Sequence, residues 1–444
     1  MSAPTLQDGI NKAGSPVRLL WKPNAAPFKV PVIKPEFVGW REEQTAWSRG
    51  VAFSDLSHHM FDTFLEGPDV TRLLTAVSAN DYESFAVGQA KQFIPVTSQG
   101  YIVTDGILMR DGPEKYTLSG VPAAQSWVKY HAQKGGYNVT ATTDPDSATR
   151  KEGPPVLFRY QVQGARALEL TELAFGGPLP KTKFFHSSVV SLAGKTFRAF
   201  RHGMAGQAGY EFIGAWQDGE AVKDALMKAG KAVGMIHVGG LAYATNGIES
   251  GWIPTPTPGI YTAPELADYR QFISLFSFEG QKPLHGTFYS ENIEDYYCSP
   301  YELGYGKSIA FNHDFIGRAA LEKAKDNVPR TKVTLVLNAH DVREAFGADP
   351  GFILSYARYR LEAAEARVGM TFYSAFIDSL GTILSLALIN NQQATPGTQV
   401  TVVWGEHPGS GTSPGADLGF KRIRAIVQPA PYNQFARTQY RQNS

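Results

Sequence analysis

Hydrophobic residues follow helical spacing in some segments of the chain and strand spacing in others. After Asp69, a good N-cap residue, one apolar stripe predicts a helix through Val70, Leu73, Leu74 and Val77. A second helix is expected to start at Asp218 and to end at Gly234, with a stripe formed by Val222, Leu226, Ala229 and Val233. Both stripes indicate helices that pack on one side against a core.

Strand-like segments lie between these two helices. β-forming residues fill positions 100–110 on both sides of Asp105-Gly106, which predicts extended chain with a turn or bulge at the glycine. Residues 195–202 place successive side chains on opposite faces, as in a strand. Because helical and strand patterns alternate, the expected fold class is α+β.

Two long stretches interrupt this alternation. Residues 252–298 are rich in proline and aromatic residues, and such an insertion usually lines or covers a site. Residues 405–419 are expected to form a surface loop. From residue 331 onward, β-runs predict a separate C-terminal barrel or sandwich over residues 331–444, so that residues 1–330 form a first region of two lobes.

The composition indicates a small-molecule partner. The chain has 444 residues, 43% of them apolar, and 42 basic against 41 acidic residues give a formal charge of +1. This balance offers no electrostatic reason to expect nucleic acid or an anionic membrane as partner. One cysteine, Cys298, excludes an intrachain disulfide and a thiolate metal cluster. With polar residues 1–14 and no apolar stretch of spanning length, we expect a cytoplasmic protein.

Several common catalytic motifs can be set aside. The stretch Gly411-Thr412-Ser413-Pro414-Gly415 has the bare nucleophile-elbow pattern, but proline cannot continue into the required helix with its N–H groups intact. No phosphate-binding loop and no zinc-protease motif occur in the sequence. His58-His59 lacks a completing ligand, and neighbours on a strand would face opposite ways, so no metal site is expected.

Five short motifs, taken in order, resemble those of the glycine-cleavage aminomethyltransferase (T-protein) superfamily. They are Asp55-Leu56-Ser57 with Glu66-Gly67-Pro68-Asp69; Gln163-Gly164 with Ala167; GMAGQAGYE over 203–211; Gly240-Leu241 with Glu249-Ser250-Gly251; and SPYELGYG over 299–306 with DFIGR over 314–318. The resemblance implies a T-protein-like, multi-lobed folate-binding fold with a C-terminal β-barrel or sandwich. Residues 1–330 would then bind folate and substrate.

Departures from the glycine-cleavage pattern are similar to bacterial tetrahydrofolate-dependent O-demethylases acting on vanillate, 3-O-methylgallate and syringate. They include Tyr243 with Ala244 near the position of an Arg-Asp pair, the aromatic insertion, and the element Gly251-Trp252-Ile253-Pro254. This resemblance implies transfer of a methyl group from a methoxy-aromatic substrate to tetrahydrofolate. The products would be 5-methyltetrahydrofolate and a catechol-type compound.

The resemblance and the chemistry of a reduced pterin together indicate cofactor-binding residues. A carboxylate can accept two parallel hydrogen bonds from the ring N–H and amino group, and the last acid of the GMAGQAGYE motif, Glu211, is expected to do so. The amide of Gln163 can serve the remaining polar groups. Trp252 could stack on the ring or cover it. Asp105, the one acid left where the glycine-cleavage enzyme has two, is a further candidate.

Displacement of a phenoxide from an aryl ether requires a proton donor. A tyrosine has a reference pKa of about 10, close to that of a phenol, and Tyr243 is the candidate acid. His59 could orient the substrate hydroxyl or relay the proton. No arginine follows Ser119-Gly120, where Val121 stands, so a carboxylate clamp would have to come from Arg201, Arg270 or a histidine, or the substrate lacks a carboxylate.

Two other functions remain open at this stage. One is a folate-dependent demethylase or aminomethyltransferase acting on an amine or sulfonium substrate, which the aromatic insertion disfavours. The other is a non-catalytic folate-binding assembly factor, although no K-G-C-Y-x-G-Q-E motif is present. The oligomeric state does not follow from the sequence.

Overall fold

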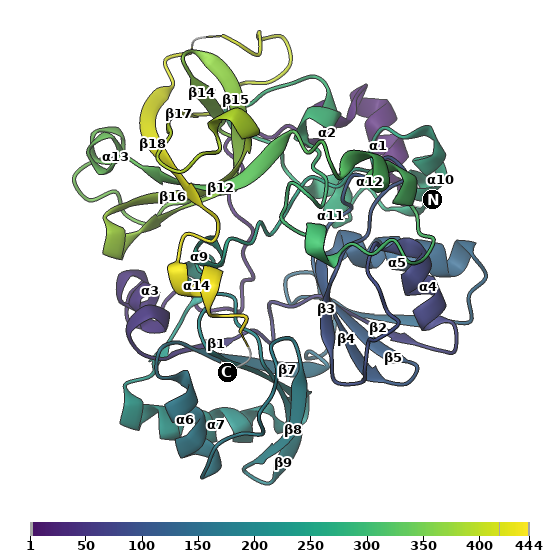
Figure 1. Ribbon diagram of the computed structural model, residues 1–444, viewed down its shortest axis with the longest axis vertical. Coiled ribbons are helices and arrows are strands. Elements are labelled where there is room, and N and C mark those ends of the chain that lie inside the picture. The colour runs from purple at the N-terminus through teal and green to yellow at the C-terminus, as the bar shows by residue number, and fades with distance from the viewer. Residues whose placement is uncertain (1–2, 417, 443–444) are drawn as a thin grey trace.

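A computed structural model describes residues 3–416 and 418–442 of the chain. Three β-sheets, each with its own helices, surround a common centre (Figure 1). The expected α+β class and multi-lobed architecture are confirmed. No helix within the described ranges is long and apolar enough to cross a membrane.

The first lobe is an antiparallel five-stranded sheet in the order β3-β4-β5-β2-β6. Its strands are β2 (Asp62–Glu66), β3 (Ala90–Phe93), β4 (Gly106–Gly112), β5 (Lys115–Gly120) and β6 (Thr140–Asp144). Two helices pack against it, namely α4 (Val70–Val77) and α5 (Pro122–Lys134). The helix expected after Asp69 is therefore confirmed, and its four stripe residues are all buried.

The second lobe is a six-stranded sheet in the order β11-β1-β7-β10-β9-β8, in which only the β1–β11 pair is parallel. Its strands are β1 (Ala52–Asp55), β7 (Leu157–Gln163), β8 (Ser187–Leu192), β9 (Lys195–Phe200), β10 (Gly209–Ala215) and β11 (Ile236–His237). One apolar face packs on α6 (Ala167–Phe175) and α7 (Gly219–Gly230), which lie on the side away from the other lobes in Figure 1. The opposite face is polar, and it is turned toward the centre.

The third lobe is a closed barrel. Six strands in the order β15-β14-β17-β18-β12-β16 return to β15, and β13 pairs with β15 from outside the ring. Their bounds are β12 (Arg330–Leu337), β13 (Leu354–Ser355), β14 (Arg360–Ala363), β15 (Ala366–Ile377), β16 (Thr382–Asn390), β17 (Gln399–Trp404) and β18 (Lys421–Pro429). Helix α13 (Ala339–Phe346) follows β12, and α14 (Gln434–Thr438) leaves the barrel to contact α9 (Gly247–Ser250). The expected β-rich C-terminal part is thus a barrel.

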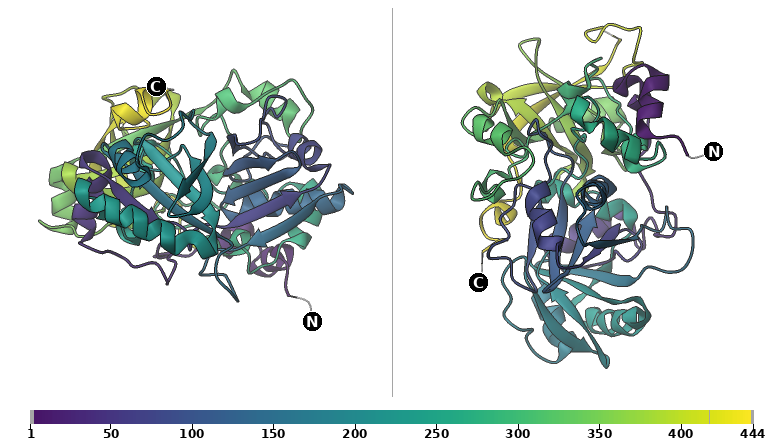
Figure 2. Two further views of the ribbon diagram at one scale, coloured as in Figure 1. Left: turned by 90° about the horizontal axis from the view of Figure 1, so that it is seen from below. Right: turned by 90° about the vertical axis from the view of Figure 1, so that its right-hand side faces the viewer.

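The remaining helices connect the lobes. They are α1 (Leu6–Ala13), α2 (Pro16–Leu20), α3 (Trp40–Arg49), α8 (Gly240–Tyr243), α10 (Ala267–Phe272), α11 (Phe278–Gln281) and α12 (Arg318–Ala324). Short 3₁₀ turns occur at η1 (Trp216–Asp218), η2 (Lys231–Val233), η3 (Pro264–Leu266), η4 (Ile293–Tyr296), η5 (Gly306–Ser308), η6 (Asp378–Leu380) and η7 (Asn391–Gln393). In both views of Figure 2 the purple N-terminal helices and the yellow C-terminal helix lie on opposite sides of the molecule.

The aromatic insertion has a largely structural role. Its rings belong to the largest apolar core, which also contains residues of the first lobe and of the barrel. Tyr261 donates to the Glu279 carbonyl, and the Tyr297 hydroxyl accepts from the Tyr261 amide, so these hydroxyls are satisfied within the insertion. At its start, however, Trp252 reaches Asp105, one of the predicted site residues.

Two local expectations need correction. Strand β4 starts at Gly106, whereas residues 100–105 are irregular because the amides of Ile102 and Val103 donate to Cys298 and Pro95 in neighbouring loops. His58 and His59 lie in a turn after β1 and not on a strand.

The second expected helix is confirmed, since α7 runs to Gly230 and one 3₁₀ turn carries the chain to Gly234 at φ +65°.

Candidate active site

Polar and apolar side chains alternate along β7, and the polar ones form the face that lies at the centre of the molecule. Arg159, Gln161 and Gln163 are two residues apart and share one face, whereas Tyr160 and Val162 join the apolar core beneath α6 and α7. Glu211 of β10 pairs directly with Gln161, so its side chain lies on the same face. The strand pairing therefore gathers one cation, one carboxylate and two amides.

Arg159 connects two acids across two lobes. Its guanidinium donates to Glu211 Oε1 at 2.8 Å and to both oxygens of Asp62 at 3.0 Å, and all three side chains are at most 6% exposed. Ser119 also contacts the guanidinium at 2.8 Å. The two carboxylates raise the pKa of Arg159 against the opposing effect of burial. The group therefore stays charged and holds Glu211 in place.

Glu211 keeps one carboxylate oxygen for a ligand. Oε1 accepts from Arg159, whereas Oε2 has no donor among the described residues and is not sealed from solvent. An anchored carboxylate with one free oxygen is suited to a ligand that presents an N–H group.

Gln163 makes protein contacts at both ends of its amide. Its Oε1 accepts from the Ala205 amide at 3.0 Å and its Nε2 donates to Gln161 at 2.6 Å. The Nε2 of Gln161, in contrast, is buried without a partner. Gln163 thus holds the loop over residues 203–209, and Gln161, which the sequence analysis missed, has the unsatisfied donor.

Glycine is required where this loop joins β10. A Cβ at Gly209 would lie 2.0 Å from the Val162 carbonyl oxygen, and φ there is +151°. Only glycine allows the loop to approach β7 this closely.

Tyr243 and His59 form the second part of the site. Their ring centroids are 5.4 Å apart in an edge-on arrangement. His59 is exposed and Tyr243 is half-buried, so solvent reaches both side chains, although the protein packed around the two rings desolvates them. The Tyr243 hydroxyl has no hydrogen-bond partner in the part of the chain that the structure describes.

Electrostatics keep Tyr243 protonated and His59 neutral. Burial raises the pKa of Tyr243, the nearby Glu211 carboxylate raises it further, and Arg159 opposes this increase. Burial lowers the pKa of His59, with Asp146 acting in the opposite direction. At neutral pH the pair therefore provides a phenol that can donate a proton and an imidazole that can accept one.

The barrel adds two tyrosines that the sequence analysis missed. Tyr356 stacks on Tyr373 with centroids 5.3 Å apart and an interplanar angle of 18°. Tyr373 donates to the Ala244 carbonyl, whereas the Tyr356 hydroxyl has no partner among the described residues. Tyr356 also lies within electrostatic reach of Tyr243. Burial alone raises the pKa of Tyr356 to about 12, so this hydroxyl is also a donor.

Asp105 and Trp252 belong to a separate cluster. Oδ2 of Asp105 accepts from Gln92 at 2.6 Å, from the Trp252 indole at 2.8 Å and from the Tyr305 hydroxyl at 2.5 Å. Its Oδ1 is buried without a partner. Burial raises the pKa of Asp105 against the effect of these donors. The structure thus joins two predicted residues, Asp105 from the irregular segment before β4 and Trp252 from the insertion.

Arg201 and Arg270, the alternative clamps, are engaged elsewhere. Arg270 donates to the carbonyls of Ile260 and Ala263 inside the insertion, and Arg201 donates to those of Thr182 and Gln442. Neither contacts Tyr243 or His59. Val121 is the residue before α5 and carries no charge.

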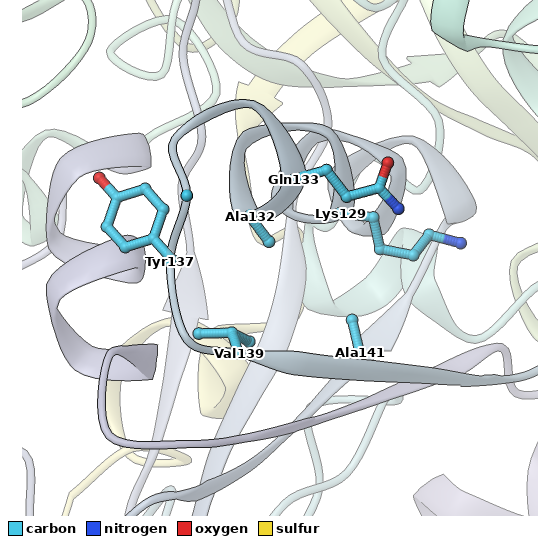
Figure 3. A pocket seen from close by; sticks show the side chains of 7 residues that line it. Lys129, Ala132, Gln133, Tyr137, Val139 and Ala141 are labelled. Carbon is cyan, nitrogen blue, oxygen red and sulfur yellow. The ribbon is translucent and has the colours of Figure 1, made fainter.

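Two other cavities are separate from these residues. One of about 280 Å³ lies between α5 and β6, where Lys129, Gln133, Tyr137 and Val139 surround it (Figure 3). The other, about 560 Å³, lies between the barrel and the end of the insertion and is lined by Tyr101, Tyr297, Arg330 and Arg367 among others. Neither includes any of the six predicted site residues.

The polar groups of the centre fit a reduced pterin. The ring presents donors and acceptors along one edge, and the centre supplies the free oxygen of Glu211 and the unpaired amide of Gln161. A ligand would be expected to satisfy both groups.

Comparisons with known proteins agree with this chemistry. The GCVT N-terminal domain family matches residues 23–256. The chain is 37% identical to the syringate O-demethylase of Sphingobium sp. (strain NBRC 103272 / SYK-6) over 99% of this chain and 98% of that protein. It is 27% identical to the sesamin methylene transferase of Sinomonas sp. (strain No.22) over 86% of this chain and 85% of that protein.

The fold is also that of a solved aminomethyltransferase. The glycine cleavage system aminomethyltransferase T from Bartonella henselae superposes with a TM-score of 0.63 at 16% identity, covering 95% of each chain. The aminomethyltransferase of Thermotoga maritima is 24% identical over 89% of this chain and 93% of its own.

The chain therefore belongs to the GCVT domain family and has the T-protein fold. Within that class it is a tetrahydrofolate-dependent methyl-transferring enzyme of the O-demethylase type, and tetrahydrofolate is its methyl-accepting cosubstrate.

Proposed function

We propose that this enzyme demethylates a methoxy-aromatic compound of the syringate, vanillate or 3-O-methylgallate type, with Tyr243 as proton donor. The observation that carries the proposal is the unpartnered hydroxyl of Tyr243, whose ring lies edge-on to His59 and which is within electrostatic reach of Glu211. The products are 5-methyltetrahydrofolate and a catechol-type compound.

Glu211 and Gln161 are the groups that support pterin binding in this proposal. When bound, tetrahydrofolate supplies the nitrogen that accepts the methyl group. Glu211 Oε2 would accept from the pterin N–H edge, while Arg159 fixes the carboxylate through Oε1. Gln163 acts indirectly here, by holding the loop over residues 203–209 and orienting Gln161. Trp252, fixed by Asp105, forms a wall beside this region.

Tyr243 and His59 act on the leaving phenoxide. The Tyr243 hydroxyl donates to the aryl-ether oxygen as its bond to the methyl carbon breaks, because a phenoxide is a poor leaving group without stabilisation. His59, neutral at pH 7, accepts a hydrogen bond from a ring hydroxyl of the substrate and fixes the ring. The stacked Tyr356 and Tyr373 provide the flat wall that an arene requires.

The runner-up is a demethylase or aminomethyltransferase for an amine or sulfonium substrate. Such a cation would be stabilised by a free carboxylate beside the reacting atoms. Among the described residues, the acid in closest electrostatic contact with Tyr243 is Glu211, which is already paired with Arg159. The non-catalytic assembly factor would leave the Tyr243–His59 pair without a role.

Three broader statements belong to the same proposal. We place the enzyme in the cytoplasm, since its buried Cys298 is a free thiol. We expect small molecules and not nucleic acid as partners, given the formal charge of +1. Residues 331–444 are proposed as the C-terminal domain and residues 1–330 as the folate- and substrate-binding region.

The test is anaerobic incubation of the protein with tetrahydrofolate and a panel of methyl donors. The panel comprises syringate, vanillate, 3-O-methylgallate, guaiacol, dimethylglycine and dimethylsulfoniopropionate, and mass spectrometry measures 5-methyltetrahydrofolate and the demethylated product. Catechol-type product supports the proposal. Product from the aliphatic donors alone would overturn the substrate class.

A further inference from the structure

Lys332 extends from the barrel toward the Asp105 cluster. On β12 the alternate residues Val333 and Leu335 fill the barrel interior, so Lys332 points outward. Its ammonium lies 5.9 Å from the ring centroid of Tyr305, whose hydroxyl is bonded to Asp105. A residue of the third lobe thereby reaches Tyr305, which connects it to the Asp105 cluster.

The Lys332 ammonium has no direct partner. No hydrogen bond or ion pair involves it among residues 3–416 and 418–442, and the side chain is only half-buried although it lies deep in the molecule. Burial lowers the pKa of Lys332 to about 8, Arg441 acts in the same direction, and Asp105 and Cys298 oppose them. The amine is therefore mostly charged at neutral pH and is open to a ligand.

The C-terminal tail brings a second cation to the same region. The Tyr440 hydroxyl accepts from the Gly203 amide at 2.6 Å and donates to the Gly203 carbonyl, which anchors the tail on the loop over residues 203–209. Next in the chain, Arg441 lies with its guanidinium 5.9 Å from the Phe184 ring and makes no ion pair in the described part of the chain. It acts electrostatically on both Lys332 and Tyr305.

The local charges are unbalanced. Arg441 acts electrostatically on Lys332, Asp105 is the carboxylate that acts on Lys332 in the opposite direction, and Oδ2 of Asp105 already accepts three hydrogen bonds. Burial also raises the pKa of Asp105, which reduces its negative charge. Arg441 is exposed and Lys332 is half-buried, so both are accessible to an anion, and an anion bound by both would relieve their mutual repulsion.

We propose that Lys332 and Arg441 form a carboxylate-binding subsite at the junction of the three lobes. The inference rests on the proposed function and deepens it, because Val121 leaves the chain without a clamp after β5. Two ligands of the reaction carry this group, namely a benzoate-type substrate and the glutamate of tetrahydrofolate. Both would gain charge-assisted hydrogen bonds from the pair.

The experiment measures dissociation constants for two matched ligand pairs on the full-length protein. One pair is syringate and 2,6-dimethoxyphenol, and the other is tetrahydrofolate and 6-methyltetrahydropterin; in each pair only the first has a carboxylate. The variants are Lys332→Met and Arg441→Gln, and exposed Lys307→Met is the control. We expect each test variant to weaken one carboxylate ligand about 10-fold or more, and the matched neutral ligand to bind as before.

The pattern of losses identifies the source of the carboxylate. A loss confined to syringate assigns the subsite to the substrate, and a loss confined to tetrahydrofolate assigns it to the cofactor tail. Unchanged affinity, or equal losses within a pair, would overturn the proposal. Wild-type affinity for the carboxylate ligand should also fall above about pH 8, as Lys332 loses its proton, and Lys332→Met should abolish that decrease.

Failure of the proposed function has a different signature. Binding is measured without turnover, so a protein that binds its ligands as described but produces no catechol from any methoxyarene leaves the carboxylate subsite intact. Only the substrate class would then be wrong.

Discussion

The guanidinium of Arg159 lies between Glu211 and Asp62, 2.8 Å from the first carboxylate and 3.0 Å from the second. Strand β7 supplies the arginine, β10 the glutamate and β2 of the first lobe the aspartate. One buried cation thereby sets the position of the Glu211 carboxylate and joins two lobes.

The first prediction separates these two roles. Glu211→Gln should weaken tetrahydrofolate binding about 10-fold or more, because an amide cannot offer the charged acceptor. Arg159→Met should lower the free energy of unfolding by about 3–5 kcal/mol, since it leaves two buried carboxylates unpaired. Fluorescence titration and denaturant unfolding measure the two effects. Equal folate affinity in wild type and Glu211→Gln would contradict the pterin assignment.

The second prediction concerns the proton donor. Tyr243→Phe should lower kcat by about 10²–10⁴-fold while leaving the dissociation constant of tetrahydrofolate unchanged. The hydroxyl has no structural partner in the described chain, so little stability should be lost. Tyr359→Phe is a matched control, because the Tyr359 hydroxyl bonds Ser355 inside the barrel. Full activity in Tyr243→Phe would remove the proposed acid.

Much of the fold could be predicted from the sequence. Helices α4 and α7 have regular apolar stripes, and the β-runs after residue 331 correspond to barrel strands. The strand expected over residues 100–105 does not form, because amides of this segment donate to loop carbonyls and not to a neighbouring strand. No local sequence pattern indicates these contacts. Propensity alone cannot predict such tertiary hydrogen bonds.

The site was predictable only in part. The sequence pointed to Tyr243, His59 and Glu211, which the fold brings together, although their roles remain proposals. It missed Arg159 and Gln161, for which a signal existed, since polar and apolar residues alternate along β7. Lys332 and Tyr356 could not have been found, because the barrel places them at the centre only through long-range packing.

The third prediction is a pH profile. Because burial lowers the pKa of His59 from the usual value of about 6.5, the fall of kcat/KM should be shifted to more acidic pH than for an ordinary histidine. His59→Gln, which keeps a hydrogen-bonding side chain without titrating, should lower kcat/KM and flatten this acid limb. If kcat/KM of the variant fell at acidic pH as it does in wild type, another group would be responsible for that decrease.

The fourth prediction concerns acid stability. His202 is 7% exposed, stacks on Phe200, and has its pKa lowered to about 3, mainly by burial. Since this value is below that of the unfolded chain, stability is fully present above about pH 6.5 and is lost as the pH falls toward 3. The loss from this residue should be about 1.4 kcal/mol per pH unit. In His202→Phe the free energy of unfolding should lack this part of the pH dependence. If the free energy of unfolding fell equally with pH in wild type and in His202→Phe, the prediction would be wrong.

The last prediction tests Tyr356 as a specificity residue. Its hydroxyl is an unpartnered donor beside Tyr243, so it can bond the oxygen ortho to the leaving group, while Tyr243 bonds the leaving oxygen itself. Tyr356→Phe should therefore raise KM about 10-fold for substrates with two neighbouring ring oxygens, such as guaiacol, and change kcat little. For a donor with a single ring oxygen, such as anisole, the variant should match wild type. A uniform loss of kcat for both donors would instead assign Tyr356 to proton transfer, and no change for either would exclude contact with the substrate.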